Sequence, residues 1–190
     1  MSQAKVLSEQ ELKRVLAVVD QMKHARRNRL LVMLSFLAGM RAGEISKLKI
    51  DHVLNADGRV RDRIHLQIGQ TKGDRQRTVI LSQRLQKEIV NFVIGLTGFM
   101  RNADQPLISS QKGGHFSPTT LVMLFRQVYD QAGLADARSH SGRRSFITKL
   151  ANKGVSVRVV QTLAGHSSMQ TTQRYIDVNE GMLVQAVELA

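Results

Sequence analysis

Tyr175 is one of two tyrosines in this chain of 190 residues, and basic side chains accompany it. His166 precedes it by nine residues, and His140 and Arg143 form a second basic cluster further upstream. Arg41 stands alone, far back in the chain. A hydroxyl nucleophile among arginines and histidines is suited to metal-free attack on a phosphodiester. These residue types therefore indicate a tyrosine that attacks a phosphate ester.

Each step of such an attack needs a particular group. A phenol has a free pKa of about 10, so the nucleophile needs a base or a cationic surround. The pentavalent phosphate gathers negative charge, which the arginine fork matches while staying ionised. The leaving 5′-oxygen needs a proton, which a lysine on a turn can deliver. The chain offers candidates for these roles: Tyr175 as nucleophile, Arg41 and Arg143 as clamp, Lys72 as acid, and His140 and His166 as the accompanying histidines.

The composition favours a polyanionic partner. The formal net charge is +13, from 28 Lys and Arg against 15 Asp and Glu. Such a charge attracts nucleic acid with a salt-dependent affinity. Aromatic residues make up 4% of the chain and tryptophan is absent, which argues against stacking on single strands. Binding along the backbone of duplex DNA suits this composition better.

Composition also limits cofactors and location. The chain has no cysteine, which excludes disulfides and thiolate metal sites, and its six histidines include no His-x-x-x-His pair. We expect no metal and no other cofactor. The longest apolar run, residues 30–40, is too short to span a bilayer, and the N-terminus lacks a secretory signal. We therefore expect a cytoplasmic protein with no membrane partner.

Hydrophobic spacing predicts a mainly α domain with a small three-stranded antiparallel β-sheet. Ser8 and Glu11 form a capping box before the first amphipathic helix. Residues 63–68 and 77–81 resemble two strands of a hairpin, to which Val53 and Leu54 add a third strand. Residues 1–190 are expected to form a single domain with its own core. Further helices are expected at residues 28–37, 42–49, 82–94, 117–133, 141–153, 155–163, 170–177 and 179–189.

Four segments in this order resemble the tyrosine recombinases, the family of phage-type integrases. Residues 38–48 (AGMRAGEISKL) are similar to the family's first arginine box, and residues 71–81 (TKGDRQRTVIL) to its β-hairpin lysine segment. Residues 140–146 (HSGRRSF) are similar to its His-x-x-Arg box, and residues 165–175 (GHSSMQTTQRY) to its terminal histidine and nucleophile. The resemblance spans roughly residues 6–180, nearly the whole chain.

The resemblance implies a role for each matched residue in site-specific DNA recombination. Tyr175 attacks the scissile phosphate and forms a 3′-phosphotyrosine, while Lys72 protonates the leaving 5′-oxygen. Arg41 and Arg143 clamp the non-bridging oxygens. His140 assists proton transfer at the nucleophile, His166 hydrogen-bonds the phosphate, and Glu44 orients Arg41.

The resemblance also implies partners. These are duplex DNA with specific recombination sites, a homo-oligomer (a tetramer) on the DNA, and accessory DNA-bending proteins. The terminal helix expected at residues 179–189 is a candidate for docking on a neighbouring subunit, or else on its own domain. Basic side chains beside the boxes are candidates for contact with DNA phosphates: Arg75, Arg77, Lys112, Arg144 and Arg174.

Several positions depart from the family pattern. Gly142 stands where the family often has Leu, Arg144 where His is common, Ala164 where Leu is usual and Asp177 where His is frequent. None of these removes a catalytic group. The boxes also begin almost at Met1, so the N-terminal core-binding (clamp) domain of the family is expected to be absent, as in short DNA invertases or a trimmed catalytic domain.

Other interpretations of the residues and of the function stay open at this point. Lys72 lies in an ordinary polar turn, so Arg75 or Arg77 could serve as the acid instead. Arg41 could be a plain cation at a helix C-terminus, with Glu44 only its ion-pair partner. The whole chain could also be a DNA-relaxing enzyme of the type IB topoisomerase kind. A third class is a non-catalytic DNA-binding regulator, since residues 155–175 resemble a helix-turn-helix.

Overall fold

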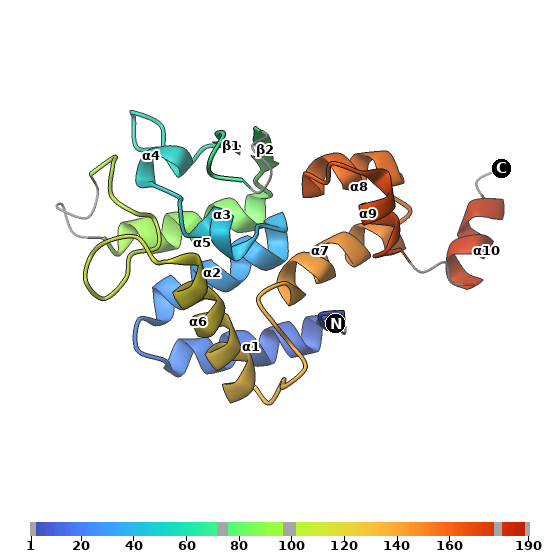
Figure 1. The fold of residues 1–190 in the computed structure, drawn as a ribbon, viewed down its shortest axis with the longest axis horizontal. Helices are drawn as coiled ribbons and strands as arrows, with labels where there is room; N and C mark the ends of the chain where they lie inside the picture. Colours follow the sequence, from blue (N-terminus) through green and yellow to red (C-terminus); the bar gives the residue numbers. More distant parts are fainter. Residues whose placement is uncertain (1–2, 72–75, 97–101, 177–179, 189–190) are drawn as a thin grey trace.

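The computed structural model describes residues 3–71, 76–96, 102–176 and 180–188 of the chain. In these ranges the protein is mainly helical, with a small antiparallel sheet along one side (Figure 1). The mainly helical class is therefore confirmed. No helix within the described ranges is long and apolar enough to cross a membrane.

Helix α2 (Ala25–Ala38) lies at the centre of the larger hydrophobic core, and its residues 30–36 are all buried. Helices α1 (Glu9–Gln21), α5 (Gln83–Ile94) and α7 (Ser141–Asn152) pack on it. It begins three residues before the predicted start because the basic side chain of Arg27 finds partners there. Its guanidinium lies 5.1 Å from the ring centroid of Phe116 and donates to the carbonyl of Ser109.

Serine caps begin three helices at the predicted places. Ser8 and Glu11 form the capping box of α1. Ser82 accepts a backbone hydrogen bond at the start of α5, and Ser117 does so at the start of α6 (Pro118–Gln131). Each cap satisfies one of the free N–H groups of a first helical turn.

Tyr129, the second tyrosine, is fully buried on α6. Its ring stacks on Phe125 with 6.0 Å between the centroids, and burial raises its pKa above the usual value. A phenol held neutral in this way packs the core and is no candidate nucleophile.

The prediction of a third strand was wrong. Within the described residues the sheet has two strands, β1 (Arg63–Leu66) and β2 (Arg77–Ile80), which are antiparallel with Ile64 opposite Val79. Val53 instead lies in a helical turn, α4 (Ile50–Val53), and Leu54 forms only an isolated bridge. A helical turn places Ile50 and Val53, three residues apart, on one buried face, which a strand would not do.

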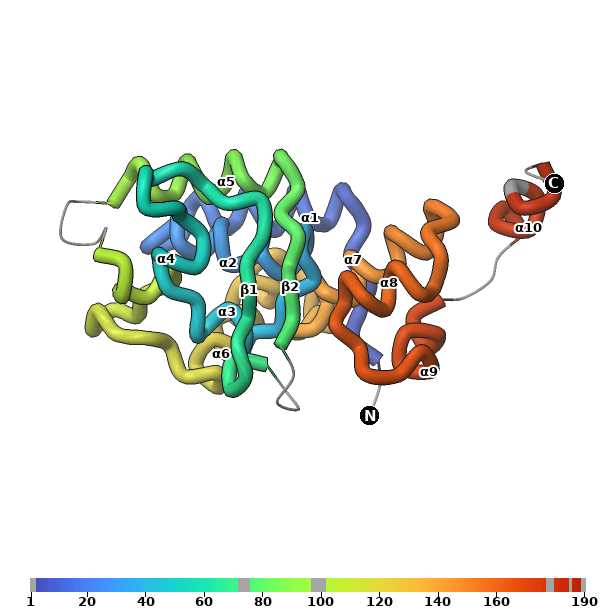
Figure 2. The backbone as a smooth tube through the Cα atoms, turned by 90° about the horizontal axis from the view of Figure 1, so that it is seen from above, coloured from blue at the N-terminus to red at the C-terminus, as the bar shows by residue number. Residues whose placement is uncertain are grey.

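The C-terminal third forms a second, smaller layer beside the sheet. Helices α8 (Val157–Ala164) and α9 (Met169–Gln173) pack on each other, and α8 also contacts α7 and β2 (Figure 2). Tyr175 packs against the small apolar cluster that these helices bury. Helix α10 (Glu180–Glu188) is set apart from the other helices in both views.

Gly142 lets α7 lie directly against α2. A Cβ atom at this position would stand 2.6 Å from Ser35 Oγ and 3.1 Å from the Ser35 carbonyl carbon. The first separation is shorter than real Cβ contacts reach, the second is tighter than most of them, and part of the obstacle is backbone. The departure from the family's usual Leu therefore has a steric reason in this chain.

We expect Gly142→Ala to destabilise the protein, although Ala is the better helix former. The added Cβ forces α7 away from α2, and overpacking of this kind costs about 1–3 kcal/mol. Thermal unfolding followed by circular dichroism checks the result. Gly43→Ala is the matched control, because a Cβ at Gly43 meets nothing within 4 Å. A melting temperature of Gly142→Ala equal to or above that of the parent would contradict the steric explanation.

Candidate active site

Helix ends bring the predicted residues together. α2 ends at Gly39, whose left-handed φ of 60° turns the chain so that Arg41 becomes the N-cap of α3 (Ala42–Ile45). α8 ends at Gly165, whose φ is 62°, and His166 follows directly. Arg143 lies in the first turn of α7. Glycine adopts left-handed backbone without strain, so both turns are available at little cost.

Glu44 is buried among the arginines, with 1% of its side chain exposed. Its Oε1 accepts from Arg41 Nη1 at 2.7 Å and from Arg77 Nη1 at 3.0 Å. Its Oε2 accepts from the Arg41 backbone N–H and from Arg77 Nη1, both at 2.9 Å. Burial opposes ionisation, but the charge of Arg77 and the contacts with Arg41 hold the pKa of Glu44 below its usual range. The carboxylate therefore joins two cations that would otherwise repel each other.

Arg143 is buried and bridges two segments of backbone. Its Nη1 donates to the carbonyl of Gly39 and its Nη2 to the carbonyl of Ala164, both at 2.6 Å. Burial, and then the charges of Arg41 and Arg77, lower the pKa of Arg143 to about 9. The guanidinium is therefore still protonated at neutral pH.

His166 is buried next to Tyr175, and the two rings stack with 5.6 Å between centroids and 22° between planes. Its Nδ1 lies 2.9 Å from the hydroxyl of Thr172, which is also fully buried. Burial, and then the charges of Arg143 and the other arginines, lower the pKa of His166 to about 4. The imidazole is therefore neutral at physiological pH.

The nucleophile candidate faces an open basic cavity. Tyr175 is half-buried in the turn after α9, and its carbonyl accepts a hydrogen bond from the Thr148 hydroxyl. The cavity has a volume of about 680 Å³. Its lining includes Arg138, His140, Arg144, Arg174 and Tyr175.

His140 connects this cavity with the arginine clamp. A neighbouring cavity of about 280 Å³ is lined by Arg41, Glu44 and His140, together with Val122 of α6. His140 is exposed and lines both cavities. Tyr175 and Arg41 therefore line two different cavities that share His140.

The structure corrects one predicted DNA contact. Arg77 was expected to contact phosphates, but only 5% of its side chain is exposed, and Glu44 and backbone carbonyls accept its hydrogen bonds. It faces inward because residues 77, 79 and 81 share the buried side of the strand. Arg174 and Lys112 are exposed, and Arg144 is half-buried. Lys72 and Arg75 lie outside the described residues, as does Asp177.

Two residues of the site were missed from the sequence. The Thr172 hydroxyl hydrogen-bonds the His166 ring. A spacing of six residues does not predict such a contact. Arg138 lines the cavity of Tyr175, but it lies outside the segments that resemble the family. The burial of Arg77 has a signal in the sequence, because strand alternation places it on the same side as Val79 and Leu81. The charge of Arg77 instead favoured a DNA contact.

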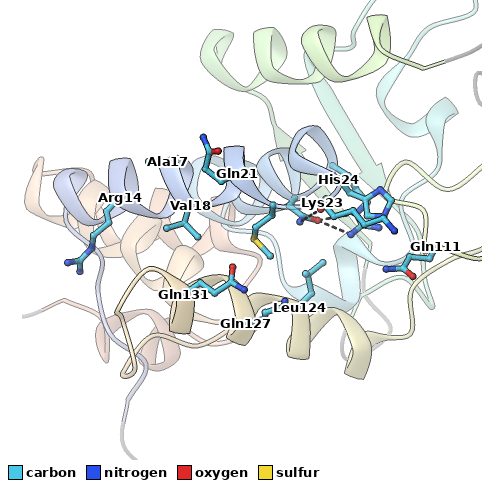
Figure 3. A pocket seen from close by; sticks show the side chains of 13 residues that line it. Arg14, Ala17, Val18, Gln21, Lys23, His24, Gln111, Leu124, Gln127 and Gln131 are labelled. Atoms are coloured by element: carbon cyan, nitrogen blue, oxygen red, sulfur yellow. Dashed lines mark hydrogen bonds between the residues drawn. The ribbon is translucent and has the colours of Figure 1, made fainter.

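A second large cavity lies away from these residues. It has a volume of about 610 Å³ and lies between α1, the start of α2 and α6 (Figure 3). Its lining is rich in amides and basic groups, including Arg14, Lys23, Gln21, Gln127 and Gln131. None of the predicted catalytic residues lines it.

The chemistry that the site can perform is transfer of a phosphoryl group to a tyrosine. Arg41 and Arg143 supply fixed positive charge, the neutral His166 supplies a hydrogen-bond donor or acceptor, and Tyr175 supplies the hydroxyl. Within the described ranges, no group of three or more His, Asp or Glu side chains could hold a metal ion. The expectation of metal-independent chemistry stays a prediction.

The chain belongs to the phage integrase family. Residues 5–182 match the sequence profile of that family, which covers almost the entire chain. The resemblance inferred from the four segments is thereby confirmed.

Curated relatives of known name are similar over most of this chain. The tyrosine recombinase XerA of Pyrococcus furiosus is 32% identical over 190 residues, which covers 98% of this chain and 62% of the relative. The tyrosine recombinase XerD of Neisseria meningitidis is 30% identical over 177 residues, 91% of this chain and 58% of the relative. The chain thus spans about three fifths of the length of these relatives.

Solved structures agree with the fold. The XerH site-specific recombinase bound to palindromic difH substrate, in a post-cleavage complex, superposes with a TM-score of 0.70 at 26% identity. That match covers 98% of this chain and 53% of the XerH chain. A crystal structure of XerA recombinase gives a TM-score of 0.75 at 24% identity, over all of this chain and 64% of that one. At that identity the XerA match supports the fold alone.

We predict that His166 stays neutral down to a pH near 4, with its proton on Nε2. Burial and the arginine charges oppose protonation, so the population of charged imidazole rises little as the pH falls from 7 to 5. A Thr172 hydroxyl that donates to Nδ1 leaves the proton on Nε2, where it can bond a phosphate oxygen. ¹⁵N shifts of the imidazole, followed from pH 8 to pH 3.5, report both the tautomer and the midpoint.

Two variants make the test specific. Thr172→Val removes the hydroxyl at nearly constant volume and should mix the two tautomers. Arg41→Gln removes one of the repelling charges and should raise the pKa of His166. A midpoint near 6.5 in the parent chain, or no tautomer change in Thr172→Val, would contradict this description of the site.

Proposed function

We propose that the chain cleaves and rejoins duplex DNA at specific sites through a 3′-phosphotyrosine intermediate, as a site-specific recombinase. The observation that carries the proposal is the position of Tyr175, which stacks on a neutral His166 and lies within electrostatic reach of the buried Arg143. Arg41, the second arginine of the proposed clamp, is held by the buried Glu44. Membership of the phage integrase family supports it. The XerH relative, captured with difH after cleavage, supports duplex DNA as the substrate.

The proposed reaction is an in-line displacement. The Tyr175 oxygen bonds to phosphorus while the bond from phosphorus to the 5′-oxygen breaks, and His140 takes the phenol proton. Arg41 and Arg143 bind the non-bridging oxygens, where negative charge develops, and His166 donates a hydrogen bond there. Lys72 gives its proton to the leaving 5′-oxygen. The reverse steps, with the 5′-hydroxyl of another strand, rejoin the DNA without an external energy source.

The remaining basic groups are proposed to hold the DNA around the scissile phosphate. Arg138, Arg144 and Arg174 line the cavity of Tyr175, so phosphates flanking the reacting one come within their reach. Lys112 and Arg75 are proposed as outer contacts. The net charge of +13 makes this part of the affinity fall with salt.

The test is a covalent adduct. Nicked duplexes with a randomised central segment are incubated with the chain in EDTA, and DNA that migrates with protein on a denaturing gel is sequenced. We expect enrichment of one site, and no adduct from Tyr175→Phe. Arg41→Ala or Arg143→Ala should slow adduct formation on the selected duplex by about a hundredfold or more, because each removes a fixed transition-state donor.

Three outcomes would contradict the proposal. Specific binding without any adduct would identify a DNA-binding regulator instead. An adduct on every duplex, with relaxation of plasmid and no strand exchange, would identify a topoisomerase-like enzyme. An adduct that needs a divalent cation would refute the metal-independent mechanism.

We further propose that α10 docks on a neighbouring copy when the chain assembles on DNA. Leu183, Val184 and Val187 expose 57%, 56% and 73% of their surface on this helix. Apolar side chains of this size in solvent favour burial against a partner. Assembly on two sites distinguishes recombination from relaxation by a single subunit.

The expected effect of Leu183→Asp with Val187→Asp is loss of strand exchange by about a hundredfold or more, since two buried apolar side chains contribute about 3–6 kcal/mol. Adduct formation on a single nicked site should persist. Ile94→Asp is the control, because Ile94 is 68% exposed on another helix. Mass photometry of the DNA complexes shows whether subunits still pair; unchanged pairing in the double variant would refute the role of α10.

A further inference from the structure

Arg77 is a buried charge that the proposed reaction does not use. Its side chain is 5% exposed, and its Nε has no hydrogen-bond partner among the described residues. Burial lowers its pKa, so the protein bears a cost to keep this cation inside. A side chain that is 5% exposed neither increases solubility nor reaches a DNA phosphate, so Arg77 must act inside the protein.

Its hydrogen bonds join the segments that carry the clamp and the histidine. Nη1 donates to both oxygens of Glu44, at 3.0 and 2.9 Å. Nη2 donates to the carbonyls of Ala38, at 3.4 Å, and Leu163, at 3.1 Å. Ala38 ends α2 three residues before Arg41, and Leu163 lies in the last turn of α8, just before His166.

Arg77 and Arg143 bridge the same two helix ends side by side. Arg143 donates to Gly39 and Ala164, the residues that follow the two carbonyls bound by Arg77. The last carbonyls of a helix lack partners within it and carry partial negative charge. Two guanidinium groups therefore tie the C-terminus of α2 to the C-terminus of α8.

The backbone of the α8 turn also fits against Arg77. A Cβ atom at Gly165 would stand 2.4 Å from Arg77 Cδ. The turn that delivers His166 is thus in close contact with this side chain. A displaced or shortened side chain at position 77 would release both the Glu44 carboxylate and the α8 turn.

We infer that Arg77 is a positioning residue for the proposed reaction: it fixes Glu44, and through it Arg41, and holds the α8 turn in register with α2. The inference rests on the proposed function. It assigns Arg77 no contact with the substrate, so the variants should bind DNA almost normally and react slowly.

The experiment compares Arg77→Ala and Arg77→Lys with the parent chain on the duplex recovered by adduct selection. Single-turnover adduct formation should fall by about a hundredfold in Arg77→Ala, the effect of misplacing a reacting group by about 1 Å. Arg77→Lys keeps a cation beside Glu44, so its rate of adduct formation should be about tenfold higher than that of Arg77→Ala. Affinity for the same duplex, measured in the Tyr175→Phe background, should change by less than about threefold, because no phosphate contact is removed.

A double variant separates positioning from general weakening. In an Arg41→Lys background, Arg77→Ala should cost at least about fivefold less than in the parent chain, because one of the two groups that it positions has already been replaced. The remaining loss reports the hold of Arg77 on the α8 turn. Arg63→Ala is the control, since Arg63 is an exposed arginine of the same hairpin whose side chain pairs with Asp62. It should leave both the rate and the affinity unchanged.

Each contrary result has a distinct meaning. Equal losses of rate and affinity would make Arg77 a DNA contact, and equal losses in both Arg41 backgrounds would overturn the inference that it positions Arg41 through Glu44. Failure of both Arg77 variants to fold, judged by circular dichroism, would also overturn the inference. Lack of any adduct from the parent chain would refute the proposed function and is seen before the Arg77 variants are compared.

Discussion

One carboxylate buried among three guanidinium groups is the constraint on which the site depends. Two like charges about 4 Å apart repel by about 4 kcal/mol at an effective dielectric constant of 20, so the buried Arg77 and Arg143 and the partly exposed Arg41 cannot gather at one place unaided. Glu44 accepts four hydrogen bonds from two of them, which uses the acceptor capacity of both oxygens. The third, Arg143, is held by backbone carbonyls instead. The cluster keeps two excess positive charges, next to the cavity that holds Tyr175.

The helices are arranged to make that excess charge tolerable. α2 and α8 both end in left-handed glycines, and their terminal carbonyls face the arginines. Partial negative charge at helix C-termini thus adds to the single full charge of Glu44. The same turns deliver Arg41 and His166, so the backbone that stabilises the cations also places two of the groups proposed to act in catalysis. This shared use explains why Gly39 and Gly165 are needed at these positions.

The sequence predicted features that depend on local chemistry and missed those that depend on packing. The capping box at Ser8 and the serine caps could be read locally, because each involves residues three apart. The third strand at Val53 failed because a short apolar pair fits a helical turn as well as a strand. The contacts of Thr172 with His166 and of Gly142 with Ser35 join side chains whose spacing follows no simple period. Arg77 was assigned to DNA from its charge, whereas its alternation with Val79 pointed to the interior.

The arrangement also bears on how the arginines act on a phosphate. Because Arg143 is fixed by two carbonyls before any ligand arrives, little reorganisation is needed when charge develops on the phosphate oxygens. Its pKa of about 9 reflects burial and the repulsion of its neighbours, and an incoming phosphate relieves that repulsion. In the proposed reaction His166, kept neutral by burial and the same charges, would add a hydrogen bond to the phosphate without adding another cation. The repulsion among the arginines is thus already present in the folded protein. A bound phosphate would relieve it, and the transition state, which carries the most negative charge, would be stabilised most.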